Sequence, residues 1–152
     1  MNTRIVRIII SLGLFVILTG VAVNAQDINL RAKIPFEFVV GNVTMPAGDY
    51  DVTKLSIGSG VFRVRAPKGE YAAMGLVMAT RRREGPATTV LVFNRYQENG
   101  GEVSHFLSKV WLEWSDTGYE FPKFRAEREA ELRAARRDII TLVVPRTNRG
   151  AE

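Results

Sequence analysis

The chain has 152 residues, of which 46% are hydrophobic and 24% charged, a composition that is typical of a globular protein and excludes a disordered one. Its 21 lysines and arginines exceed its 16 acidic residues by a formal charge of +5, which favours loose attraction to anionic polymers or lipids. The sequence contains no cysteine, which excludes disulfides and a lipid-modified N-terminal cysteine.

The first 25 residues are typical of a secretory signal peptide. Arg4 and Arg7 form a short basic region, residues 8–23 form an apolar run, and Val23 and Ala25 occupy the two positions that a signal peptidase reads. Cleavage after Ala25 leaves 127 residues with a net charge of +3, the length of one domain. The apolar run is only slightly short of the roughly 20 residues that span a bilayer, so a retained membrane anchor is the alternative. We expect a secreted or periplasmic protein.

Four strands are predicted in the first half of the mature chain. Apolar and polar residues alternate from Leu30 to Phe38, and a period of two is typical of a half-buried strand. Pro35 cannot donate a ladder hydrogen bond, which indicates a sheet edge or a bulge. Turn residues separate three further strands at 50–55, 61–66 and 71–80. The residues predicted to face the core in the last two are Phe62, Val64, Ala66, Met74, Leu76 and Met78.

Two longer strands follow. Residues 88–96 are apolar on both faces, which indicates a central or covered strand. Residues 102–114 alternate, with a predicted core face of Phe106, Val110, Leu112 and Trp114. Short strands joined by hairpin-length turns predict a mainly β fold, an antiparallel meander that forms a small barrel or sandwich.

One C-terminal α-helix is predicted over residues 124–137, which are rich in alanine, glutamate, arginine and leucine. Arg125 and Glu129 stand four residues apart with opposite charges, as on a surface helix. The apolar stripe is thin, so docking of the helix on the sheet stays open; its members are Phe124, Leu132 and Ala135.

The predicted organisation has four parts. They are a signal peptide (1–25), a β-rich domain (26–121), a helical segment (122–138), and an edge strand with a disordered tail (139–152). The edge strand itself is predicted at 139–144, where branched residues are frequent.

No catalytic, cofactor-binding or metal-binding set stands out. His105 is the only histidine, and a lone histidine without cysteine does not make a typical zinc site. Ser104 and Ser108 fall on the opposite strand face from His105, so neither can use it as a base. The turn at 58–60 lacks the lysine and the spacing of a nucleotide-binding loop. A pair of carboxylates, as in glycosidases, remains open as a catalytic alternative.

Two groups of residues are candidate partner contacts. Trp111 is predicted to share the non-core face of its strand with His105 and Lys109, and an exposed tryptophan beside a cation suits a ligand or partner. Burial of Trp111 under the predicted helix is the alternative. The cluster Arg81, Arg82 and Arg83 could bind phosphate or sulfate, with a solvated loop as the alternative. Aromatic residues do not interleave with these cations, so we expect no nucleic-acid partner.

Five stretches carry a family resemblance: IPFEFVVGN (34–42), MPAGDY (45–50), LVFNRY (91–96), FLSKVW (106–111) and AERE (126–129). In them the chain resembles a group of small, uncharacterised exported proteins, seen especially in soil bacteria of the acidobacterial type. The AERE stretch is similar to the C-terminal ending of that group, whereas this chain continues through residues 139–152. The resemblance implies an envelope or extracellular location and implies no activity.

Three functions are compatible with these features. The leading hypothesis is a non-enzymatic binding or structural module of the cell envelope, whose partner is an envelope protein or an anionic envelope polymer. The second is a carrier that holds a small apolar ligand inside a barrel lined by Phe62, Met74, Met78 and Phe106. The third is a carboxylate-based hydrolase.

Overall fold

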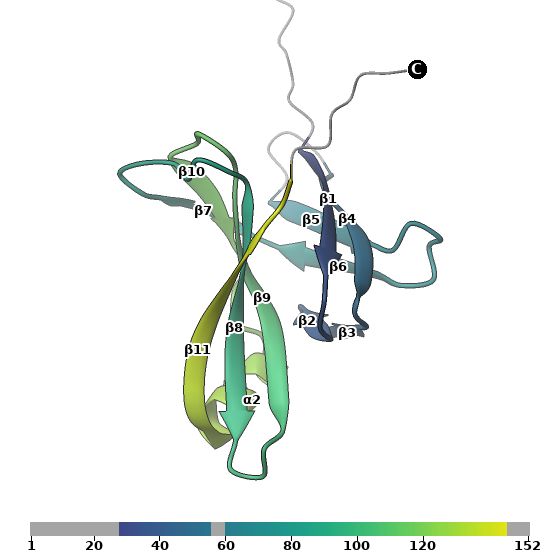
Figure 1. The fold of residues 1–152 in the computed structure, drawn as a ribbon, viewed down its shortest axis with the longest axis vertical. Coiled ribbons are helices and arrows are strands. Elements are labelled where there is room, and N and C mark those ends of the chain that lie inside the picture. Colours follow the sequence, from purple (N-terminus) through teal and green to yellow (C-terminus); the bar gives the residue numbers. More distant parts are fainter. Residues whose placement is uncertain (1–27, 56–59, 146–152) are drawn as a thin grey trace, which may run out of the picture.

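The computed structural model describes residues 28–55 and 60–145, which form two β-sheets and one helix (Figure 1). Both sheets contribute side chains to one shared core, and within the described ranges neither sheet closes on itself. The predicted mainly-β fold is therefore confirmed, in its sandwich form. The predicted signal peptide and residues 146–152 of the predicted tail lie outside the described residues. Within those ranges, no helix is both long and apolar enough to cross a membrane.

The smaller sheet, sheet A, has four antiparallel strands in the order β1-β4-β5-β6. They are β1 (Asn29–Ile34), β4 (Gly48–Lys54), β5 (Val61–Arg65) and β6 (Ala72–Leu76). Alternate residues of β4 and β5 are fully buried, among them Val52, Phe62 and Val64, as the sequence predicts. β4, β5 and β6 are neighbours in the sheet in the same order as in the chain, so this part of the protein is a simple meander.

The larger sheet, sheet B, has seven strands, five of them in the order β11-β8-β9-β10-β7. These are β7 (Met78–Arg81), β8 (Val90–Glu98), β9 (Val103–Trp111), β10 (Thr117–Glu120) and β11 (Ala134–Val143). The hairpin of β2 (Phe38–Val40) and β3 (Val43–Met45) joins them through one parallel pairing, Val39 with Phe106. β8 lies between β9 and β11, which confirms the central strand that its two apolar faces predict.

The chain crosses from sheet A to sheet B at two points where the sequence predicts unbroken strands. β1 ends at Ile34, Pro35 follows, and β2 begins in the other sheet at Phe38. Proline has no N–H, so the ladder of β1 cannot continue through it. The second crossing is at Val77, between β6 and β7. The predicted strands at 30–38 and 71–80 are therefore each two strands in different sheets.

The predicted core face of residues 71–80 is wrong. Met74, Leu76 and Met78 are 64%, 65% and 63% exposed, whereas their neighbours Ala73 and Val77 are buried. A period of two does not indicate which of the two sets of residues points inward, and the prediction places the larger side chains in the core. At Gly75 the core has no room for a side chain, because a Cβ there would lie 2.6 Å from the ring of Phe121.

A similar shift affects β9. Its ladder with β8 is irregular between Leu107 and Lys109, where Ser108 is an extra residue. Such a bulge exchanges the two faces of a strand. Leu107 and Val110 therefore both join the main core, while Phe106 points to the other side of sheet B. The predicted common face of Phe106 and Val110 is wrong for this reason.

Trp114 also departs from the prediction. β9 ends at Trp111, and Trp114 follows in a turn with a φ of 57°. Its side chain is 74% exposed, and its indole nitrogen donates to Glu113. The last three residues of the predicted strand, 112–114, are not part of β9, so the strand alternation does not apply to Trp114.

The helix α2 (Arg125–Arg133) is shorter than predicted. The chain becomes extended at Ala134, and Arg136 and Arg137 pair with Gln97 and Tyr96 of β8. Pairing along β8 overrides the helix propensity of the alanines and arginines there. β11 occupies the edge of sheet B, which confirms the predicted edge strand and starts it at Ala134.

Gly60 is required at the second crossing. Its carbonyl accepts a 2.6 Å hydrogen bond from the Val77 N–H, and a Cβ on Gly60 would lie 2.6 Å from the Val77 carbonyl oxygen. Because that oxygen is backbone and cannot rotate away, we expect Gly60→Ala to lower the free energy of unfolding by about 1–3 kcal/mol in urea titrations followed by circular dichroism.

Gly100→Ala is the matched control. No atom lies within 4 Å of the position of its Cβ, and neither glycine has a left-handed φ. We expect the control to change stability by less than about 0.5 kcal/mol. Equal urea midpoints for the two variants would contradict the close contact at the crossing.

Candidate functional site

The best candidate for a functional site is the groove between α2 and the face of sheet B that points away from the core. α2 lies against β8 and β11 (Figure 1). Ala130 of the helix packs with Tyr96 and Phe106 in a second apolar cluster, in which the two rings are 5.7 Å apart. The question that the sequence leaves open is thereby answered, since the helix docks on the sheet. We call this surface the helix groove.

A buried carboxylate anchors the helix. Glu127 is only 4% exposed, and its Oε1 accepts hydrogen bonds from Asn94 Nδ2 at 2.7 Å and from the Tyr96 hydroxyl at 3.1 Å. A buried carboxylate is destabilising unless such donors compensate it. Burial, and next the nearby Glu127, raise the pKa of the Tyr96 phenol, so its proton is retained for this hydrogen bond.

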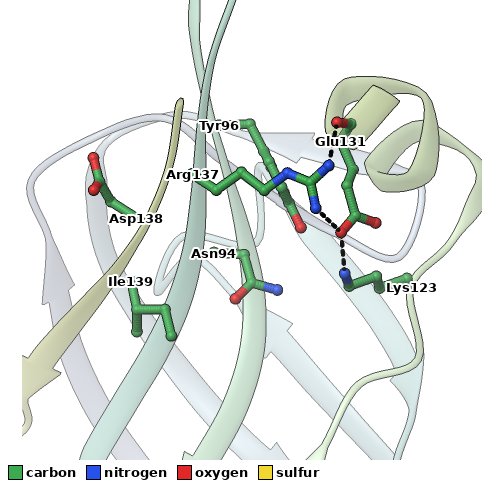
Figure 2. Close-up of a pocket in the computed structure, with 7 residues that line it drawn as sticks. All are labelled: Asn94, Tyr96, Lys123, Glu131, Arg137, Asp138 and Ile139. Carbon is green, nitrogen blue, oxygen red and sulfur yellow. Dashed lines mark hydrogen bonds and ion pairs between the residues drawn. The ribbon is translucent and has the colours of Figure 1, made fainter. Parts of the chain in front are cut away.

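A three-residue ionic cluster lies beside this anchor. Lys123 Nζ and Arg137 Nη1 donate to the same oxygen of Glu131 at 2.8 Å and 2.9 Å, and Arg137 Nη2 donates to the Glu131 carbonyl. Dashed lines mark these three contacts in Figure 2. The hydrogen bond from Lys123 lowers the pKa of Glu131, and the same bond raises the pKa of Lys123. Both charges therefore persist over a wide pH range and tie the segment before α2, the helix and β11 together.

The cluster borders a hollow of about 490 Å³. Its lining, drawn in Figure 2, consists of Asn94, Tyr96, Lys123, Glu131, Arg137, Asp138 and Ile139. Asp138 forms ion pairs with Arg95 and Arg136, whose nitrogens each lie 3.0 Å from its Oδ2. This half of the helix groove is thus polar, and its charges are largely paired with one another.

The other half of the groove is a hollow of about 610 Å³ that shares Asn94, Lys123 and Ile139 with the first. Met78, Val92 and Ile139 give it an apolar side. Besides Lys123, its cations are Lys109, which is 3.3 Å from Glu120, and Arg128. In the described part of the chain the Arg128 guanidinium has no ion-pair partner. An unpaired guanidinium beside an apolar wall is suited to an anionic ligand.

The structure separates His105 from the other two predicted contacts, Lys109 and Trp111, which remain on one face of β9. The bulge at Ser108 places His105 on the core side of sheet B and Lys109 on the outer side. The His105 ring stacks on Phe36 at 4.2 Å and donates from Nδ1 to the Glu37 carbonyl at 3.1 Å. Burial lowers the pKa of His105, so it is a neutral packing residue. Of the three, Lys109 alone lines the helix groove.

Trp111 is buried, at 8% exposed, but not in the way the sequence suggests. The Arg82 guanidinium lies 5.2 Å from the centre of its ring, and Gly118 of β10 leaves space beneath it. The covering residue is thus Arg82, a cation–π contact, and not the helix, which lies on β8 and β11.

The three arginines of the predicted anion site do not converge. Arg82 is engaged with Trp111, while Arg81 lies on β7 and Arg83 in the loop after it, both exposed. Arg82 and Arg83 line a hollow of about 450 Å³ together with Glu84, so an acid accompanies the two cations there.

The residues named for an internal ligand do not line one cavity. Phe62 belongs to the main core and Phe106 to the second cluster, while Met74 and Met78 are exposed. For hydrolysis, Glu131 is unsuited as a general acid because its pKa is lowered. Among the described residues there is no group of three or more histidine, cysteine or acidic side chains arranged for a metal ion.

Sequence reasoning missed Glu127, Asn94, Lys123 and Arg128. The helix was assigned the stripe Phe124, Leu132 and Ala135, yet Leu132 is 85% exposed and the buried positions are Glu127 and Ala130. The signal available in the sequence was the spacing of Glu127 and Ala130, since residues three apart lie on the same face of a helix. No family model, no curated protein and no solved structure matches this chain.

Proposed function

We propose that this protein is an exported, non-enzymatic binding module of the cell envelope and that the helix groove binds an anionic ligand, with an acidic envelope polymer as the expected class. The observation that carries the proposal is the unpaired Arg128 beside Lys123 and an apolar wall. Export rests on the signal-like residues 1–25 and on the resemblance to small exported proteins.

The charge of the groove supports an anion as ligand. Lys109, Lys123, Arg128 and Arg137 face three carboxylates, those of Glu120, Glu131 and Asp138, which leaves one positive charge in excess. The ion pairs of Lys123 and Arg137 hold those side chains in place before a ligand arrives. Side chains fixed in advance lose little conformational entropy on binding, which favours affinity.

The apolar wall supports a ligand that is larger than a single ion. Val92 and Ile139 flank the cations, and Met78 extends the wall from β7, the strand at the other edge of sheet B. A volume of about 610 Å³ falls within the range of small-molecule sites and accommodates a few sugar units or a short segment of a polymer. Sugar rings and alkyl segments present apolar surface to such a wall while their acidic groups meet Arg128.

We expect the Arg128→Gln variant to bind polygalacturonate about tenfold more weakly than the unmodified protein, in isothermal titration calorimetry at low salt. A hydrogen bond to a charged group contributes about 1.5–3 kcal/mol, and glutamine retains the size of the side chain without its charge. Neutral dextran serves as the ligand control, and we expect it not to bind.

The matched protein control is Arg125→Gln. Arg125 lies on the same helix, is exposed, and pairs with Glu129 away from the groove. Removal of its charge changes the net charge of the protein equally, so it reports the non-specific part of the attraction. If both variants lose affinity to the same degree, or if neither protein nor variant binds an acidic polymer, the proposed site is wrong.

A further inference from the structure

The outer face of sheet A, which points away from the core, carries apolar side chains next to cations. Met74 stands opposite Arg63 and Leu76 opposite Val61 in the pairing of β5 with β6. Directly paired residues point to the same face, so these four side chains are adjacent. Arg65, two residues after Arg63 on β5, points to the same face. We call these five residues the outer strip.

The apolar part of the outer strip is unusually exposed. Met74 and Leu76 are 64% and 65% accessible, and β6 is the last strand of sheet A, so no strand of the described chain covers them from that side. The large residues of β6 thus face solvent while its small residues face the core. Neighbouring large apolar side chains at a sheet edge indicate a docking surface.

The cations of the strip are free to bind an anion. Arg63 and Arg65 form no ion pair among the described residues. Asp51 stands opposite Arg65 in the pairing of β4 with β5, but its carboxylate is bound to Arg31 at 3.1 Å. The β1-β4 side of the face is therefore neutralised by its own pair, and the β5-β6 side remains positive.

We propose that the outer strip docks the protein on an anionic lipid bilayer. Met74 and Leu76 enter the boundary between headgroups and acyl chains, and Arg63 and Arg65 bind lipid phosphates. A bilayer surface supplies the two chemistries in this arrangement, an apolar layer beneath a layer of anions. A second copy of the chain fits less well, because an isologous contact would set the unpaired arginines of both copies together without a carboxylate to pair with them. The proposal does not depend on the helix groove.

The test is co-sedimentation of the exported protein with vesicles of phosphatidylglycerol and phosphatidylcholine. The N-terminus of the protein is first determined by mass spectrometry. We expect binding to vesicles with 40% phosphatidylglycerol, little binding to pure phosphatidylcholine, and release in 0.5 M NaCl. The double variant Arg63→Gln with Arg65→Gln is expected to bind about thirtyfold more weakly, roughly fivefold for each charge. The double variant Met74→Ser with Leu76→Ser is expected to lose at least about tenfold.

Matched controls remove the same groups elsewhere. Arg125→Gln with Arg136→Gln removes two exposed charges, and Leu132→Ser removes an exposed leucine of α2. We expect near-unchanged vesicle binding from both controls, with circular dichroism showing that every variant is folded. Equal losses in the strip and control variants would overturn the proposal. The proposal would also be overturned if the unmodified protein did not bind anionic vesicles. It would equally be overturned if light scattering showed that the unmodified protein is a dimer and that the Met74→Ser, Leu76→Ser variant is a monomer.

Discussion

We expect the Phe93→Ala variant to lose about 3–5 kcal/mol of unfolding free energy. Phe93 on β8 is fully buried, and its ring makes edge-on contacts with Phe36 at 5.2 Å and Phe38 at 5.7 Å. Phe38 belongs to the β2-β3 hairpin, so the truncation removes contacts that join this hairpin to the centre of sheet B. Urea unfolding followed by circular dichroism measures the loss.

Leu132→Ala is the control for this truncation. Leu132 also loses a large apolar side chain, but it is 85% exposed on α2, so its removal leaves no cavity. We expect a change of less than about 0.5 kcal/mol. A loss at Phe93 of similar size would mean that the core adapts to fill the space, contrary to the packing described above.

The second large effect is expected at the buried carboxylate. Glu127→Ala removes the acceptor of both Asn94 and Tyr96, and so leaves the Tyr96 hydroxyl proton without this acceptor in a cluster where Tyr96 is 3% exposed. A buried donor without a partner costs about 1–3 kcal/mol, and the lost contact of the helix adds to it. We expect a total loss of about 2–3 kcal/mol, measured in the same urea titrations.

Two comparisons isolate the hydrogen bonds from the helix itself. Glu127→Gln keeps a carbonyl oxygen as acceptor and is expected to lose about half as much as Glu127→Ala. Glu129→Ala removes a carboxylate from the same helix, where it is paired with the exposed Arg125, and is expected to change stability by less than about 0.5 kcal/mol. If Glu127→Ala and Glu129→Ala are equally stable, the carboxylate of Glu127 does not anchor α2.

The sequence predicts most of the longer strands of this protein because burial on one face leaves a period of two, whereas β10 is not predicted. The central position of β8 follows from local residues alone. The orientation of β6 does not, since its outcome depends on Phe121, a residue 46 positions later that fills the space above Gly75. The bulge at Ser108 cannot be predicted locally either. Because β9 has one extra residue there, Leu107 points to the core and Phe106 to the outer face, the opposite of what a regular alternation predicts.

The helix groove could be predicted only in part. Lys109 was singled out, because an exposed cation near an aromatic residue on a strand is visible in the sequence. Arg128 was not, since it is one of many arginines in a charged helix and its neighbours Met78 and Val92 come from distant strands. The anchor of the helix joins Asn94 to Glu127 over 33 residues, and nothing local indicates that pairing.

The connections between the sheets have a consequence for how the protein opens. The chain passes from β1 to β2, back from β3 to β4, and again from β6 to β7, so each sheet holds strands whose chain neighbours belong to the other sheet. One sheet cannot separate from the other without pulling on all three connections, at Pro35, between Met45 and Gly48, and at Val77. Local opening is therefore confined to the free ends of the sheets, while the slowest amide protons of both sheets exchange with solvent only when the whole domain unfolds. In this sense the sandwich is a single cooperative unit, held together by chain connectivity as well as by its core.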